Sequence, residues 1–208
     1  MALFPAFLKL DGRRCLVVGA GRVGENKIAS LIRAGAEIRV VAPKATRRVR
    51  AWARAKKIRW EARSFRASDL AHTFLVIAAT SSPVLHSGIH AQARRRGVLC
   101  NAVDDPEHCD FYYGAVVRRG ALQIAVSTEG HSPALAQRLK KKIAAEFGAD
   151  YQSWLDEIGE IRNRLFADGK LSSTRRKAIL HRLASEKSFE EFQRRPKIGR
   201  KPSRKSHE

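Results

Sequence analysis

The chain has little cysteine, and its cysteines form no pattern that would build a metal site or a disulfide framework. Three occur in 208 residues, at Cys15, Cys100 and Cys109, without C-x-x-C spacing. This excludes zinc-ribbon and thioredoxin-type motifs. No apolar run is long enough for a membrane span, and Met1–Pro5 lacks the basic start and long apolar centre of a signal peptide. We therefore expect a cytoplasmic protein with free thiols and no membrane span.

Acidic residues are also scarce. The chain has 20 Asp and Glu against 41 Lys and Arg, a formal net charge of +21. This excess attracts anions, whether nucleic acid, an anionic membrane surface or an acidic small molecule. No helix-turn-helix, zinc or RNA-binding signature is present, so nucleic acid is not favoured as a partner. Residues 194–205 hold seven basic residues and no acid, and we expect 193–208 to be a disordered basic tail, either solubilising or functional.

A glycine motif is the most informative feature that is present. Residues 14–18 are typical of a buried strand and residues 23–34 of a helix. The G-x-G-x-x-G motif consists of Gly19 and Gly21, between the strand and the helix, and Gly24, near the start of the helix. In this motif the first glycine makes a tight turn, the second lets the backbone approach a phosphate, and the third lets the helix pack on the strand. The helix N-terminus attracts the anion. We predict a dinucleotide site; the alternative is a glycine turn without a ligand.

The next predicted strand, 37–41, lacks the acid that usually binds the ribose 2′-hydroxyl. Ala42, Pro43 and Lys44 follow it instead, with Arg47 and Arg48 just beyond. Charge alone favours a 2′-phosphate, and hence NADP, or a ribose held by backbone groups. Alternatively, the two arginines are solvated residues at the start of a helix.

Strand and helix patterns alternate as far as residue 101. This alternation predicts an α/β fold with a Rossmann-type, doubly wound parallel sheet. Ligands of such sheets bind at the carboxyl ends of the strands. Four segments should therefore face one crevice, namely 19–24, 42–44, 79–82 and 101–105. The further predicted strands are 58–63, 74–78 and 98–101, and the further predicted helices are 45–56 and 83–96.

The pattern changes after residue 105. Residues 111–113 are predicted as a strand, 115–118 and 122–127 as a hairpin turning at Arg119-Gly120, and 134–147 as a helix begun by Ser132 and Pro133. Helices follow at 151–166 and 174–185. We predict four parts: a Rossmann domain at 1–110, a β-hairpin and helix region for dimerisation and substrate at 111–147, a small C-terminal helical domain at 148–192, and the tail.

Several segments, in order along residues 3–147, carry a family resemblance. They are 4–8, 15–21 with Lys27, 78–80, 101–106, 109–111, 116–120, and 125–128 with Gly130, Ser132 and Pro133. In these segments the chain resembles the siroheme synthase N-terminal-type family of precorrin-2 dehydrogenases. Some members of that family are also sirohydrochlorin ferrochelatases.

The resemblance implies NAD-dependent oxidation of precorrin-2 to sirohydrochlorin in siroheme biosynthesis. A homodimer is expected separately, because the short exposed strands of the hairpin and the apolar face of the helix after Ser132 need cover. Members use NAD although they also lack the acid after the second strand, so this absence argues less for NADP. The family's catalytic aspartate falls on Asp104, which would accept a proton or orient the macrocycle; without the resemblance, a turn residue is the better interpretation. The implied partners are acidic tetrapyrroles and, in the ferrochelatases, ferrous iron.

The candidate site residues follow from the glycine motif, the strand ends and the resemblance together. Arg118 and Arg119 can also be read as solvated hairpin charges. The candidates are Asp104 for catalysis; Gly19, Gly21, Arg22, Val23, Gly24, Pro43, Lys44, Thr80 and Ser81 for the cofactor; and Arg118, Arg119, Ser127, Thr128, His131 and Ser132 for the substrate.

We predict no preformed metal cluster. His86 and His90 are spaced i, i+4 but lack the glutamate of H-E-x-x-H, so we expect both on an exposed helix face. Asp104, Asp105 and His108 are near enough in sequence to be considered for iron insertion.

Four positions depart from the family pattern. Gly24, His86, Gly114 and Glu129 stand where alanine, asparagine, proline and glycine are usual, and Glu129 adds negative charge beside a site for a polycarboxylate.

Two other functions remain open. Another NAD(P)-dependent oxidoreductase would have no reason to carry both 101–106 and 127–133. A nucleotide-sensing regulatory Rossmann domain would lack a base at the crevice.

Overall fold

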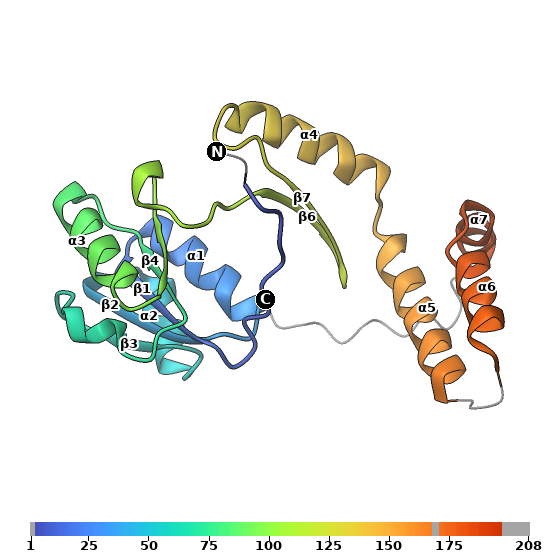
Figure 1. Ribbon diagram of the computed structural model, residues 1–208, viewed down its shortest axis with the longest axis horizontal. Helices are drawn as coiled ribbons and strands as arrows, with labels where there is room; N and C mark the ends of the chain where they lie inside the picture. Colours follow the sequence, from blue (N-terminus) through green and yellow to red (C-terminus); the bar gives the residue numbers. More distant parts are fainter. Residues whose placement is uncertain (1–2, 168–170, 197–208) are drawn as a thin grey trace. The chain divides into compact units, whose positions relative to one another are not determined.

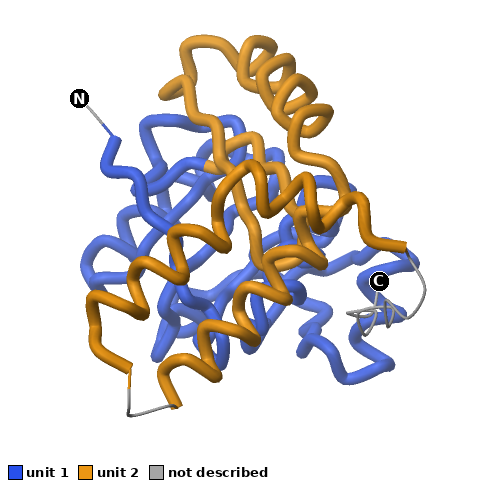
Figure 2. The backbone as a smooth tube through the Cα atoms, turned by 90° about the vertical axis from the view of Figure 1, so that its right-hand side faces the viewer, with its two compact units in different colours: residues 1–112 blue, residues 113–208 orange. Residues whose placement is uncertain are grey.

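The chain folds into two compact units, residues 1–112 and 113–208, coloured separately in Figure 2. The computed structural model describes residues 3–167 and 171–196. Within these residues, no helix combines the length and the apolar character needed to cross a bilayer.

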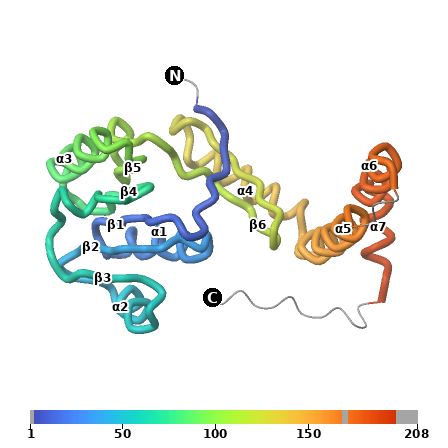
Figure 3. Tube along the Cα trace, turned by 60° about the horizontal axis from the view of Figure 1, so that its bottom comes forward, coloured from blue at the N-terminus to red at the C-terminus, as the bar shows by residue number. Residues whose placement is uncertain are grey.

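A five-stranded parallel sheet forms the centre of the first unit and confirms the predicted fold class. Its order is β3-β2-β1-β4-β5, which Figure 3 shows from edge to edge. The central strands β1 and β4 are buried on both faces, as their unbroken apolar runs predict. The strands are β1 (Arg14–Ala20), β2 (Glu37–Ala45), β3 (Arg59–Glu61), β4 (Leu75–Ala78) and β5 (Leu99–Ala102).

Helices cover both faces of this sheet (Figure 1). On one face, Ile28 and Leu31 of α1 (Arg22–Arg33) and Val49 of α2 (Arg47–Arg54) pack in one hydrophobic core. On the other face, Ile89 and Ala93 of α3 (Pro83–Arg94) pack in a second core. The two cores hold the carboxyl ends of the strands in fixed positions, and the candidate cofactor residues follow those ends.

The strand β2 extends four residues beyond its predicted end. Pro43 and Lys44 are its exposed last residues before Ala45, which pairs with Ala20 across a bulge in β1. Helix α2 then begins later than predicted because the Thr46 side chain caps it, accepting a hydrogen bond from Val49 N at 3.2 Å. The β2–α2 junction is therefore a tight corner rather than a loop.

A buried ion-pair cluster fixes the chain before β4. Asp69, in the short 3₁₀ helix η1 (Ala67–Leu70), is 2% exposed. Arg63 donates to both of its carboxylate oxygens, at 2.7 and 2.9 Å, and Arg39 lies 3.2 Å away. Burial raises the pKa of Asp69, but hydrogen bonds from Arg63 and from Arg66 N outweigh it and hold this pKa below its ordinary value.

The prediction of a strand at residues 111–113 is wrong. The main-chain carbonyl of Phe111 accepts a hydrogen bond from the Asn101 side chain at 2.8 Å instead of from a neighbouring strand. Phe111 packs against the α1 core, whereas Tyr112 and Tyr113 are about 40% exposed. Tertiary contacts thus override the high strand propensity of three consecutive aromatic residues. A second 3₁₀ helix, η2 (Pro106–His108), lies just before this segment.

The second unit begins with the predicted hairpin. Strands β6 (Ala115–Arg119) and β7 (Leu122–Val126) pair antiparallel, and Gly120 makes the turn with φ +58°. Helix α4 (Pro133–Glu146) contacts both strands and begins as predicted, with Ser132 as N-cap and Pro133 in the first turn.

Three helices follow: α5 (Asp150–Ala167), α6 (Ser173–Leu183) and α7 (Glu186–Arg194). The α7 helix was not expected as a separate element. Ser185 caps it, and Phe189 packs against Tyr151 and Trp154, with ring centroids 4.2 and 4.9 Å away. The helix runs two residues into the predicted tail, and residues 197–208 of that tail lie outside the described residues. The four-part division of the chain stays a prediction.

Candidate functional site

The three glycines of the motif have different local roles. Gly19 has φ +102°, and a Cβ there would lie 2.2 Å from the Ala79 carbonyl oxygen. A Cβ on Gly24 would lie 2.3 Å from the Gly19 carbonyl oxygen. At Gly21, in contrast, a Cβ would meet no atom within 4 Å. Gly19 and Gly24 therefore allow the backbone to pack, whereas Gly21 leaves open space beside the helix N-terminus.

This N-terminus is suited to bind an anion. Gly21 is the N-cap of α1 and offers no side chain to the first N–H groups of the helix. Arg22 and Val23 follow as exposed residues of the first turn. The N–H groups of a first helical turn have no intrahelical acceptor and lie at the positive end of the helix dipole. A phosphate in the space beside Gly21 would satisfy them.

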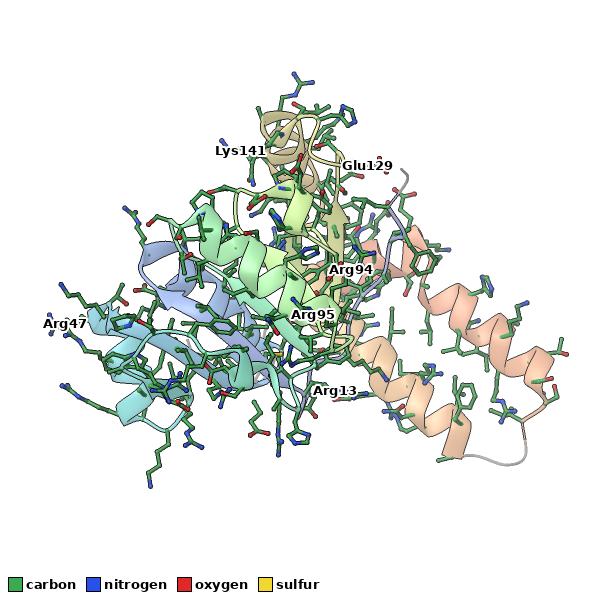
Figure 4. All side chains as sticks on the ribbon, turned by 60° about the vertical axis from the view of Figure 1, so that its left-hand side comes forward. Arg13, Arg47, Arg94, Arg95, Glu129 and Lys141 are labelled. Atoms are coloured by element: carbon green, nitrogen blue, oxygen red, sulfur yellow. The ribbon has the colours of Figure 1, made fainter. Side chains whose placement is uncertain are left out.

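An acid reaches the end of β2 from α1. The Glu25 carboxylate accepts a hydrogen bond from Thr46 Oγ1 at 2.6 Å and lies 3.8 Å from Arg48 Nη1. Arg48 also lies over the Trp52 ring, while Arg47 points away from the unit at the start of α2 (Figure 4). Sequence reasoning missed Glu25 because it looked for an acid only after the second strand. The available signal was an acid in the first turn of the glycine-motif helix.

The end of β4 leads through Thr80 and Ser81 into α3. Ser82 caps this helix, and its N–H lies 3.4 Å from Thr80 Oγ1. Thr80 is half-buried and Ser81 is exposed. A second helix N-terminus thus follows the strand next to the glycine turn.

The expectation that His86 and His90 lie on an exposed helix face is wrong. His86 is 5% exposed, and His90 is half-buried. His86 Nε2 lies 3.0 Å from the Thr80 carbonyl oxygen, and its Nδ1 lies 3.4 Å from Asp105 Oδ2. Helix α3 turns this face toward β5 and the loop after it, which its weak periodicity did not reveal.

The candidate catalytic residue follows β5. Asp104 is exposed and adopts a left-handed conformation with φ +61°, which aspartate tolerates better than most residues. The next residue, Asp105, accepts from His108 Nδ1 at 2.8 Å. This hydrogen bond holds the pKa of Asp105 below its ordinary value, against the effect of burial. Asp105 therefore contacts two histidines, His86 and His108, whereas Asp104 is exposed.

Lys27 brings α1 into the electrostatic environment of Asp104. Burial lowers the pKa of Lys27, and the nearby Asp104 and Cys109 oppose this shift. The ammonium group thus lies in the field of the Asp104 carboxylate. In the sequence, Lys27 is marked only by the family resemblance.

The three cysteines are free thiols. Burial raises the pKa of Cys15 to about 11 and that of Cys100 to about 12, and it also raises the pKa of Cys109. Cys109 Sγ lies 3.0 Å from the Ala102 carbonyl oxygen. All three are therefore protonated near neutral pH and act as packing residues.

Over 3–167 and 171–196, no group of three or more His, Cys, Asp or Glu side chains could hold a metal ion.

The other candidates lie in the second unit, in the loop before α4. Thr128 Oγ1 accepts from Ser132 N, and Ser127 Oγ accepts from Glu129 N, both at 3.2 Å. The main-chain N–H of His131 donates to the Thr128 carbonyl oxygen at 2.8 Å. Glu129, labelled in Figure 4, has φ +51°. A glycine adopts this conformation without strain, which explains why glycine is usual at this position.

The two hairpin arginines differ. Arg118 is exposed and donates to the Gln123 side chain. Arg119 donates through Nη2 to the Ala144 carbonyl near the end of α4, at 2.8 Å, and its Nε is buried without a hydrogen-bond acceptor. Arg119 therefore ties the hairpin to α4, and Arg118 is the more exposed of the two.

A cavity of about 860 Å³ lies at the opposite end of the parallel sheet. Arg14, Glu37 and Arg59, which begin β1, β2 and β3, contribute to its lining. None of the candidate site residues lines it. Ligands of doubly wound sheets bind at the carboxyl ends of the strands, so this cavity is not the dinucleotide crevice.

Comparison with known proteins supports the assignment of the first unit. Residues 6–115 match the family described as "Putative NAD(P)-binding", and residues 119–146 match "Sirohaem biosynthesis protein central". The chain is similar in fold to SirC, a precorrin-2 dehydrogenase, with a TM-score of 0.77 and 24% identity over 92% of this chain and 97% of that one.

Two siroheme synthases are among the most similar curated relatives. The protein from Nitrosococcus oceani is 40% identical over 175 residues, which cover 79% of this chain and 37% of that protein. Siroheme synthase 1 from Serratia proteamaculans is 36% identical over 174 residues, 82% of this chain and 37% of that protein. The chain thus spans little more than a third of each relative's length. The resemblance to siroheme synthases is confirmed, and the chain belongs to the NAD(P)-binding family that matches just over half of its length.

Proposed function

We propose that the chain catalyses NAD-dependent oxidation of precorrin-2 to sirohydrochlorin in siroheme biosynthesis. A hydride passes to NAD⁺ and a proton to a base, so that precorrin-2 and NAD⁺ give sirohydrochlorin, NADH and H⁺. The observation that carries the proposal is that one unit holds an open glycine turn after β1 and an exposed aspartate after β5, at the carboxyl ends of two strands of the same parallel sheet. The similarity to siroheme synthases supports the choice of substrate.

The glycine turn would hold the cofactor's pyrophosphate. The open space at Gly21 and the exposed first turn of α1 suit a phosphate. The nicotinamide, when bound, supplies the hydride acceptor. Thr80 and Ser81 at the start of α3, and Pro43 and Lys44 at the end of β2, are the proposed contacts on either side.

Asp104 is the proposed catalytic residue. It is exposed after the end of β5, two strands from β1 in the sheet. The histidines His86 and His108 contact its neighbour Asp105. As a carboxylate it would accept the proton lost from the macrocycle or orient the ring for hydride transfer.

Glu25 supports NAD rather than NADP. Its carboxylate lies at the end of β2, where a dinucleotide fold places the adenosine ribose. It also engages Arg48, one of the two arginines that would otherwise favour a 2′-phosphate. A negative charge at this point repels a 2′-phosphate and accepts a hydrogen bond from a 2′-hydroxyl.

The second unit would bind the substrate's carboxylates. Arg118 offers an exposed guanidinium, and the N-terminus of α4 offers N–H groups after Ser132. The remaining proposed contacts are Arg119, Ser127, Thr128 and His131. Iron insertion is not part of the proposal, because Asp105 and His108, two of its three candidate groups, are hydrogen-bonded to each other.

We also propose that the second unit forms a homodimer. Within the described residues its sheet consists of β6 and β7 alone, and Leu135 on α4 is 40% exposed. Two-stranded sheets are marginal alone, and exposed strand edges favour pairing with another chain.

The decisive assay supplies precorrin-2 without oxygen and compares NAD, NADP and no cofactor. We expect sirohydrochlorin, followed by its absorbance, with NAD and much less with NADP. Another NAD(P)-dependent oxidoreductase, or a nucleotide-sensing domain, would bind the cofactor and leave precorrin-2 unchanged. That result would overturn the proposed function.

A further inference from the structure

The buried imidazole of His86 joins two loops that the proposed reaction uses. Its Nε2 lies 3.0 Å from the carbonyl oxygen of Thr80, in the loop that follows β4. Its Nδ1 lies 3.4 Å from Asp105 Oδ2, in the loop that follows β5 and carries Asp104. His86 is fixed on α3, and only 5% of it is exposed. One side chain therefore contacts both loops from within the unit.

Both ring nitrogens face groups that can only accept a hydrogen bond in these contacts. A carbonyl oxygen has no proton to donate, so Nε2 must carry one. The Asp105 carboxylate already accepts from His108 Nδ1 and is ionised, since that bond and the neighbouring histidines hold its pKa below its ordinary value. A bare Nδ1 would direct its lone pair at this carboxylate. A ring that carries a proton on each nitrogen would satisfy both contacts.

The other titratable groups around His86 belong to the same network. His90, one turn later on α3, meets the His108 ring edge-on with centroids 5.2 Å apart. His90 Nε2 also lies 3.9 Å from Asp110 Oδ1, while Asp110 Oδ2 accepts from Cys100 N in β5 at 2.8 Å. The elements packed against His86 thus present Asp105 directly, with His108, His90 and Asp110 connected to it.

We propose that His86, protonated on both nitrogens, is a positioning residue that holds the Thr80 loop and the Asp104 loop at one spacing. The inference rests on the proposed function for its catalytic meaning, but the link between the loops can be measured without catalysis. When the ring loses a proton at higher pH, one of the two contacts must break. The loop after β5 is then free to move Asp104 relative to the cofactor loop, so kcat falls while the KM for NAD changes little.

Nuclear magnetic resonance of the full chain tests the link directly. With ¹⁵N-labelled histidine, we expect both nitrogens of His86 to carry protons at acidic to neutral pH. As the pH rises, the amide resonances of Thr80 and Asp104 should shift together with the His86 ring. In His86→Asn this shared titration should disappear. A singly protonated His86 at pH 6, or amide shifts that persist in His86→Asn, would overturn the proposal.

The pH profile of kcat provides the second readout. We expect the fall at high pH in the wild type to be absent from His86→Asn, whose kcat should be about tenfold lower at neutral pH, with the KM for NAD within about twofold. His72→Asn is the matched control, because His72 is exposed and has φ +57°, which asparagine accepts; its profile should equal that of the wild type. Retention of the fall in His86→Asn would refute the positioning role. If the wild type oxidises no precorrin-2, the proposed function fails, and the resonance experiment still decides the link.

Discussion

Gly21 and Gly24 lie three residues apart, and their substitutions should have opposite consequences for folding and cofactor binding. A Cβ at Gly24 would lie 2.3 Å from a main-chain oxygen, so the backbone of α1 or β1 must move. Overpacking of this kind costs about 3 kcal/mol. For a chain of this size, that corresponds to a fall in Tm of roughly 6–12 °C. Gly24→Ala is therefore expected to destabilise the first unit.

Gly21→Val should instead leave the fold intact and remove cofactor binding. A Cβ there meets nothing within 4 Å, and φ is −74°, which any residue adopts. The free energy of unfolding should thus change by less than about 1 kcal/mol, while the valine fills the space proposed for the pyrophosphate. Calorimetry gives Tm for both variants, and titration calorimetry gives the Kd for NAD. A Gly21→Val variant with normal NAD affinity would refute the phosphate site, and a Gly24→Ala variant with unchanged Tm would refute the packing role.

Four further predictions follow from single residues. Asp104→Ala should lower kcat about a hundredfold with the Kd for NAD unchanged, measured by steady-state kinetics; near-normal turnover would reduce Asp104 to a turn residue. Glu25→Gln keeps the acceptor for Thr46 but removes the charge, and should raise NADP affinity relative to NAD roughly tenfold in competition titrations. Glu129→Gly should stabilise the fold by about 1 kcal/mol, since it relieves a left-handed glutamate, whereas Glu129→Ala should not. Asp69 has a depressed pKa, so its contribution to stability is present above pH 3.8 and is lost as the pH falls further. In urea unfolding, Asp69→Asn should therefore lower the free energy of unfolding by about 3 kcal/mol at pH 7 and by much less in acid.

The spacing of apolar residues, together with the glycines between strands and helices, was sufficient to predict most of the first unit. The apolar runs of β1 and β4 and the glycine turn between β1 and α1 are local signals, so their positions were predicted within a few residues. The strand at 111–113 was wrongly predicted because one long-range hydrogen bond, from Asn101 to Phe111, decides that segment. Local propensity contains no information about such a contact.

The same limit applies to the candidate site. The glycines and Asp104 are candidates because a motif or a resemblance marks them. Glu25 and His86 were missed or misplaced because their partners, Thr46 and Asp105, lie 21 and 19 positions away in the chain. Their roles depend on which strand ends become neighbours, and the sheet order alone determines that.

The central claim is that this chain transfers a hydride from precorrin-2 to NAD. Its most direct test measures NADH and sirohydrochlorin formed together from precorrin-2 in the absence of oxygen. We expect one NADH for each sirohydrochlorin, and no sirohydrochlorin above the enzyme-free control when NAD is omitted. Sirohydrochlorin formation that does not require NAD, or NADH that does not match it, would contradict the account.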